Sequence, residues 1–174
     1  MPIYRFILFF LFATFVYQAE SQTNYSEINY SKIKQKKIQE FLHSEANAQH
    51  SLLDIHASLQ KNGDTEGYHQ QTQEFYIKGG LNEVWQHYLI TNPSDSWNSK
   101  KVSFAMLFSK KEKRVIYKND YISRLDTGQV VFLNLKLLNG LTNLASIFEF
   151  ITVDTKNKVL EFSYVEGNTT QGKQ

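Results

Sequence analysis

The chain has 174 residues, a formal net charge of +2, no cysteine, and an aromatic content that includes 13 Phe and 10 Tyr. The small net charge argues against binding to nucleic acid, and the lack of cysteine excludes disulfides, thiolate metal ligands and a cysteine nucleophile. The aromatic content is typical of a packed sheet and not of a disordered linker.

The N-terminus predicts a secretory signal peptide. Arg5 precedes an apolar run over residues 6–17, and small and polar residues follow. As a helix this run spans about 18 Å, which is shorter than the roughly 30 Å hydrocarbon core of a bilayer. The Ala-Glu-Ser sequence at 19–21 fits cleavage before Gln22. We therefore expect residues 1–21 to be removed, leaving a secreted or periplasmic protein without a stable membrane span; an uncleaved signal anchor is the alternative.

Residues 22–67 are predicted to form an N-terminal helical extension. Helical propensity and an apolar stripe run over residues 31–60. The stripe fades between His43 and Ser51, so the pattern fits either one long helix or two helices joined near residues 46–49. The turn-forming sequence KNGDTEG then ends this helical region.

Beyond residue 67 the pattern changes to short strands around one helix. Residues 68–77 are predicted to form a strand, and GGLNEVWQHYLITNP is predicted to form a helix that Pro93 ends. Further strands are expected at 102–108, 114–117, 130–138, 145–153 and 158–166. Their short connections require antiparallel neighbours. The expected fold class is α+β, with a curved antiparallel sheet of about six strands covered by helices.

Two stretches carry a resemblance to a known family. QEFYIKGGLNEVWQHYLITNPSDSW, and the later ASIFEFITVDTKNKVLEFSYVEGN, resemble the START-like or polyketide-cyclase-like (SRPBCC) superfamily, whose fold is called the helix-grip. The similarity covers residues 68–168, and we assign 68–174 to this domain. Members of the family continue into a last strand and a long C-terminal helix, which have no counterpart here. The resemblance therefore implies either a C-terminally truncated product or a helix of residues 31–60 that covers the sheet instead.

The resemblance also implies an apolar, ligand-sized cavity between the sheet and its helices. Large apolar side chains on the predicted helix and strands are the candidates to line it. They are Trp85, Tyr88, Trp97, Phe104, Met106, Phe132, Phe148, Phe150, Phe162 and Tyr164. We expect Trp85 at the floor of the cavity and Trp97 at its mouth. The alternative is that these side chains only fill a core, which is the commoner outcome in a small domain.

No catalytic, metal-binding or nucleotide-binding motif is present. The histidines lack the spacing and carboxylate partners of a metal site, and neither a G-x-S-x-G turn nor a phosphate-binding loop occurs. We therefore predict no catalytic residue, no metal and no cofactor. The basic runs at 32–37 and 110–114 are interpreted as solvated surface, with contact to anionic lipid or a polyanion as the alternative.

The predicted function is the binding of an apolar or amphipathic small molecule or lipid by an exported domain. One alternative is a hydrolase, cyclase or isomerase of the same fold that uses His87 or a strand carboxylate, such as Glu149 or Glu161, as a general base. The other alternative is an envelope interaction module that has a filled core and no ligand.

Overall fold

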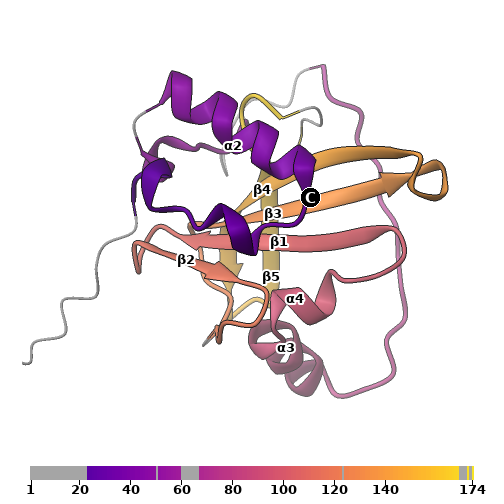
Figure 1. Ribbon diagram of the computed structural model, residues 1–174. Helices are drawn as coiled ribbons and strands as arrows, with labels where there is room; N and C mark the ends of the chain where they lie inside the picture. Colours follow the sequence, from indigo (N-terminus) through magenta and orange to yellow (C-terminus); the bar gives the residue numbers. More distant parts are fainter. Residues whose placement is uncertain (1–22, 50, 60–66, 123, 169–171, 173) are drawn as a thin grey trace, which may run out of the picture.

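A five-stranded antiparallel sheet forms the centre of the computed structural model, which describes residues 23–49, 51–59, 67–122, 124–168, 172 and 174 (Figure 1). Its strands are β1 (Val102–Ser109), β2 (Arg114–Tyr117), β3 (Gln129–Leu137), β4 (Thr142–Asp154) and β5 (Val159–Tyr164). Their order across the sheet is β2-β1-β3-β4-β5. The predicted α+β class with an antiparallel sheet is confirmed, but the sheet has five strands and not about six.

The strand predicted for residues 68–77 is wrong. These residues belong to a long connection without strand pairing, which Figure 1 shows descending along the right-hand side of the molecule to α3 (Leu81–Ile90). We call residues 67–80 the arch. Phe75 and Tyr76 of the arch do not pack, since they are 79% and 99% exposed.

The outer edge of β5 is already occupied, which explains why the arch does not pair there. The Ser58 amide donates to the Tyr164 carbonyl at 2.7 Å, and the Tyr164 amide donates to the Gly172 carbonyl at 2.9 Å. Farther along, Phe162 and Gln174 exchange backbone hydrogen bonds of 2.7 and 2.8 Å. Ser58 from the N-terminal part of the chain, and Gly172 and Gln174 from the C-terminus, thus cover an edge that could otherwise accept the polar segment 68–77.

One face of the sheet is covered by the N-terminal segment. This segment contains α2 (Lys36–Ala48) and the 3₁₀-helices η1 (Tyr25–Glu27), η2 (Tyr30–Lys32) and η3 (Leu52–Asp54). Ile38 and Leu42 of α2 are fully buried. They pack in a core with sheet residues that include Ala105, Met106, Phe108, Val130, Phe132 and Ile147. α2 ends at Ala48 and is followed by the three-residue 3₁₀-turn η3, so among the described residues neither one long helix nor a second α-helix covers 31–60.

The opposite face of the sheet is covered by α3 and by the short helix α4 (Pro93–Ser96). Trp85 and Leu89 of α3 are buried there at 6% and 2% exposure. Leu81 does not share this buried face, because it is the first residue of α3 and is 69% exposed. Only the later turns of α3 are fastened to the sheet side, where the Leu125 amide donates to the Leu89 carbonyl at 2.7 Å. α2 and α3 therefore lie on opposite faces.

A β-bulge in β1 changes which side chains reach each face. The pairing of β1 with β3 shifts register between Phe104 and Met106. As a result Phe104 joins the core under α3, whereas Ala105 and Met106 both join the core under α2. An extra residue of this kind reverses the alternation that a regular strand follows.

Leu42→Ala is expected to show that the N-terminal segment is part of the folded domain. The loss of this fully buried side chain should lower the free energy of unfolding by about 2–5 kcal/mol. Asn47→Ala, an exposed position on the same helix, is the control and should change stability by less than about 0.5 kcal/mol. Chemical denaturation of both variants measures the difference. Equal stability of the two would contradict a core shared between α2 and the sheet.

Candidate functional site

A cluster of aromatic rings covers β4 and β5 on the α3 face of the sheet. The centroid of the Trp97 ring lies 5.3 Å from the ring centroid of Phe148 and 6.2 Å from that of Phe150. The ring of Phe162 lies 4.4 Å from Phe148, and that of Tyr164 lies 6.3 Å from Phe162. The pairing of β4 with β5 places Phe148 opposite Tyr164 and Phe150 opposite Phe162. We call these rings the aromatic cluster.

The Asn-Pro sequence positions Trp97 in the aromatic cluster. The Asn92 side chain caps α4 by accepting from the Ser94 amide at 2.9 Å, and Pro93 takes the first helical position, where its missing N–H is not needed. Asn92 also donates to the Asp120 carbonyl at 3.2 Å. After one turn, the Trp97 amide donates to the Pro93 carbonyl at 3.0 Å. This short helix returns the chain to the sheet, so that the indole packs on β4.

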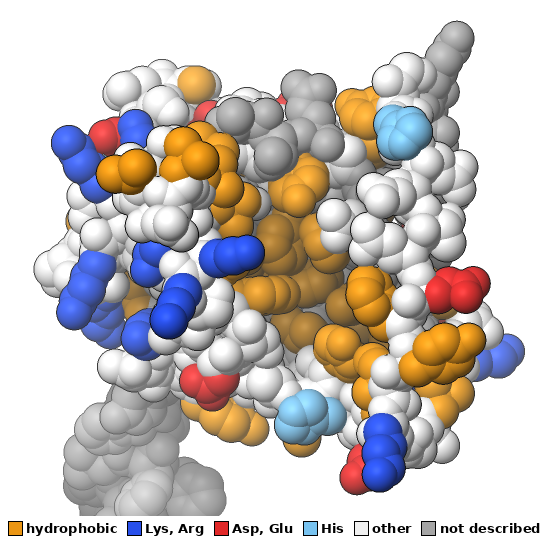
Figure 2. All heavy atoms as spheres, turned by 90° about the vertical axis from the view of Figure 1, so that its right-hand side faces the viewer, with side chains coloured by type: hydrophobic (Ala, Val, Ile, Leu, Met, Phe, Trp, Pro, Cys, Tyr) orange, Lys and Arg blue, Asp and Glu red, His pale blue; other side chains and the backbone are white. Residues whose placement is uncertain are grey.

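The aromatic cluster is only partly covered. Phe148 and Phe150 are buried at 4% and 1% exposure, whereas Trp97, Phe162 and Tyr164 are half-buried. Figure 2 views the molecule from the side where the arch runs, and it shows a hollow whose floor is formed by hydrophobic side chains. Lysine and arginine side chains gather to the left of this hollow. We call this depression on the α3 face the hollow.

Most of the predicted cavity residues come together on the α3 face. They are Trp85, Trp97, Phe104, Phe148, Phe150, Phe162 and Tyr164. Met106 and Phe132 lie instead in the core under α2. Met106 lies there because of the bulge, and Phe132 because it alternates with Val131 and Leu133 along β3. Tyr88 lies on the outer side of α3 and is 53% exposed.

A second depression, which sequence analysis did not predict, lies on the α2 side of the sheet. It has a volume of about 1040 Å³ and lies between the start of α2, the ends of β2 and β3, and the start of β1 and β4. Its lining includes Lys32, Lys34, Lys36, Lys37, Lys118 and Lys136, and Asp120 is the only carboxylate among the described residues that line it. We call it the lysine groove.

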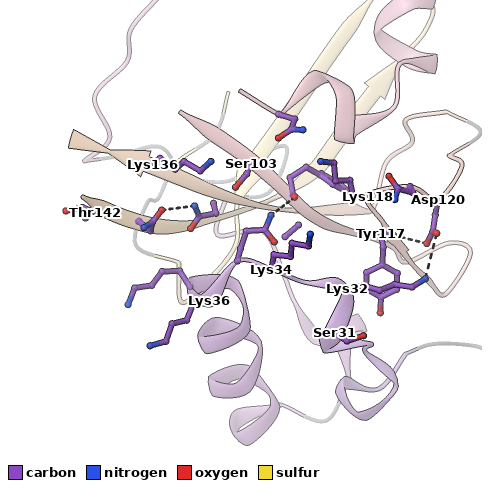
Figure 3. A pocket seen from close by; sticks show the side chains of 18 of the residues that line it. Ser31, Lys32, Lys34, Lys36, Ser103, Tyr117, Lys118, Asp120, Lys136 and Thr142 are labelled. Carbon is purple, nitrogen blue, oxygen red and sulfur yellow. Dashed lines mark hydrogen bonds and ion pairs between the residues drawn. The ribbon is translucent and has the colours of Figure 1, made fainter. Parts of the chain in front are cut away.

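Polar contacts shape the floor of the lysine groove (Figure 3). The Gln35 side chain donates to the Phe104 carbonyl at 2.8 Å, next to the bulge, and Asn134 donates to Asn143 at 3.0 Å. Figure 3 shows Lys36 and Lys136 on the side of the groove where Thr142 lies, with Lys32 and Asp120 on the other side. The Lys32 Nζ lies 4.0 Å from the Asp120 Oδ1. Part of this groove was visible in the basic run at 32–37, but Lys118 and Lys136 come from distant strands.

The groups considered for catalysis do not form a site. Glu149 accepts from the Lys110 ammonium at 2.8 Å and from the Ala57 amide at 3.1 Å, so both carboxylate oxygens are engaged. His87 is exposed on α3. Among the described residues, no three His, Cys, Asp or Glu side chains are arranged to hold a metal ion. In the same part of the chain, no helix has both the length and the apolar character needed to cross a bilayer.

Comparisons with known proteins give no relative for this site. No model of a protein family matches the chain, and no curated protein or solved structure matches it. The resemblance to the START-like superfamily thus remains a prediction.

The two tryptophans are expected to respond differently to truncation. Trp85→Ala should lower the free energy of unfolding by about 3–5 kcal/mol, because it removes a buried ring from the core. Trp97→Ala should cost less than about 1.5 kcal/mol, because Trp97 is only half-buried. Denaturant midpoints of the two variants test this difference. An equal loss of stability would mean that Trp97 is an ordinary core residue.

Proposed function

We propose that this protein binds an apolar or amphipathic small molecule in the hollow above the aromatic cluster. The supporting observation is the difference between the two faces of the sheet. Under α2, the sheet residues Met106, Phe108 and Phe132 are all 0% exposed. On the α3 face, Trp97, Phe162 and Tyr164 of the aromatic cluster remain half-buried.

The energetics favour an occupant of the hollow. Apolar surface removed from water contributes about 25 cal/mol per Å², so a ligand covering roughly 100 Å² of the rings gains about 2.5 kcal/mol from them alone. Aromatic faces and edges also accept flat or branched apolar groups in several orientations. Such a floor is typical of sites for hydrophobic small molecules.

We propose further that the elements around the hollow form a helix-grip-like fold. α3, the Asn-Pro turn, α4 and Trp97 lie on one face of the sheet in the order that the resemblance implies. α2 does not close the hollow, because it packs on the opposite face. The arch, residues 67–80, crosses this side instead, and in the proposal it closes over the bound molecule.

Export from the cell is a further part of the proposal. The signal peptide predicted at residues 1–21 lies outside the described residues. An enzyme of the same fold is less well supported, since the Glu149 carboxylate is held by Lys110 and Ala57 on the α2 side and does not face the hollow. The binding proposal therefore assigns no catalytic role to any residue.

Binding of the neutral fluorescent probe N-phenyl-1-naphthylamine tests the hollow directly. The wild-type protein should bind it with increased emission, and Trp97→Ala combined with Tyr164→Ala should weaken binding roughly tenfold, because two rings of the floor are lost. A neutral probe is used so that the lysine groove does not attract it. Native mass spectrometry of protein from its natural source then identifies any co-purified hydrophobic molecule.

Phe41→Ala is the matched control for the binding experiment. Phe41 is a half-buried aromatic residue on the α2 side, where its ring lies 6.4 Å from that of Phe132. This variant removes a ring of similar exposure from the face without the hollow, so probe affinity should stay within about twofold of wild type. Equal weakening by Phe41→Ala, or no weakening by the double variant, contradicts the proposal.

A further inference from the structure

The turn between β3 and β4 exposes leucine side chains to solvent. Leu137 is 43%, Leu138 is 73% and Leu141 is 87% exposed. Figure 1 shows this hairpin projecting beyond the rest of the molecule. We call residues 137–141 the leucine tip. Because Leu138 and Leu141 are mostly exposed, their apolar surface is available to a partner.

The backbone of the leucine tip gives a second reason to look for a partner. Leu138 has a φ of 49°, in the left-handed region, and it is followed by Asn139 at 57° and Gly140 at 92°. Asn and Gly adopt this region readily, but a residue with a leucine side chain does so at a cost. Leu138 thus combines an unfavourable backbone conformation with a side chain that is largely exposed.

Positive charge lies directly beside the leucine tip. Leu141 lines the lysine groove together with Lys34, Lys36 and Lys136, so the tip and the groove form one continuous surface. Among the described residues, no carboxylate lies within ion-pair distance of Lys34, Lys118 or Lys136. The first turn of α2 contains no acidic residue either. The uncompensated charge of this surface is therefore positive.

We propose that the leucine tip and the lysine groove together dock the protein on a bilayer that contains anionic lipids. The leucines enter the interfacial region, where buried apolar area supplies part of the affinity, and the lysines contact the lipid phosphates. A soluble polyanion would use the lysines alone and would leave the leucines exposed. The presence of both features on one surface favours a membrane.

This docking surface goes beyond the proposed binding of a small molecule and does not depend on it. Docking through this surface would nevertheless place the hollow close to the bilayer. Figure 2 shows the hollow and a group of basic side chains on the same side of the molecule. A protein docked in this way presents the hollow near the bilayer, so that an apolar molecule can pass between the two.

Vesicle flotation of the purified protein tests the docking surface. Vesicles of mixed phosphatidylglycerol and phosphatidylcholine should bind the wild-type protein, and pure phosphatidylcholine vesicles should bind it much less. Leu138→Asn combined with Leu141→Ser should lower partitioning roughly tenfold or more, because two inserting side chains are lost. The denaturation midpoint of this variant should stay unchanged or rise, because Asn accepts the left-handed conformation better than Leu does. A purely structural role for Leu138 would lower the midpoint instead.

Charge reversal tests the lysine groove, with a matched control at the other end of the sheet. Lys36→Glu combined with Lys136→Glu should reduce binding to anionic vesicles roughly tenfold or more, and high salt should weaken wild-type binding. Lys113→Glu combined with Lys156→Glu changes the charge equally at the β1–β2 and β4–β5 turns, and it should leave binding nearly intact. All variants carry the same N-terminal apolar run, so any contribution of that run to vesicle binding is equal in all of them. Differences in binding between the variants therefore report on the substituted surfaces.

Several outcomes would overturn the docking proposal. If the leucine variant binds vesicles as well as the wild type does, the leucines do not insert and the surface is only a site for anions. Equal losses from the two charge-reversal pairs would mean nonspecific attraction. Binding of soluble heparin without binding of anionic vesicles would identify a polyanion site. Because the neutral naphthylamine probe is measured without vesicles, the binding proposal can fail or succeed separately.

Discussion

The fold depends on a sheet that is apolar on both faces. Along β3, Val130 and Phe132 point to the α2 side, whereas Val131 and Leu133 point to the α3 side, and all of them are buried. Such a sheet is stable in water only if both faces are covered. The N-terminal segment, with α2 and its 3₁₀-turns, covers one face with a packed core. Because α3 and α4 are short, they cover the other face incompletely, and the hollow is the consequence.

This asymmetry relates the architecture to the proposed functions. The α2 side provides stability, and its lysines lie at the margin of the sheet, where the N-terminus of α2 meets the ends of the strands. The α3 side keeps the aromatic cluster accessible beneath the arch. The β3–β4 hairpin projects at the same end, with its exposed leucines. Ligand binding and membrane docking can therefore use neighbouring surfaces of one rigid sheet.

The local pattern of the sequence predicted the elements better than their pairing. Short polar turns required antiparallel strands, and Pro93 was predicted to end the preceding helix, which stops at Ile90. The short helix α4 that begins at Pro93 was not predicted. The bulge after Phe104 could not be predicted, since nothing in an apolar run shows where one residue is extra. The failure at 68–77 has a tertiary cause, because Ser58 and the C-terminal residues Gly172 and Gln174 occupy the edge of β5. The lysine groove combines side chains from distant segments, so only its run at 32–37 was visible.

The most direct test of the account uses the two tryptophans of the chain as separate reporters. Trp85→Phe leaves only Trp97, beside the hollow, and Trp97→Phe leaves only Trp85, in the core under α3. The measurement is the quenching of tryptophan fluorescence by a brominated fatty alcohol, a neutral apolar molecule that quenches on contact. We expect saturable quenching of Trp97 and little quenching of Trp85. Equal quenching of both, or quenching of neither, would contradict a ligand site above the aromatic cluster.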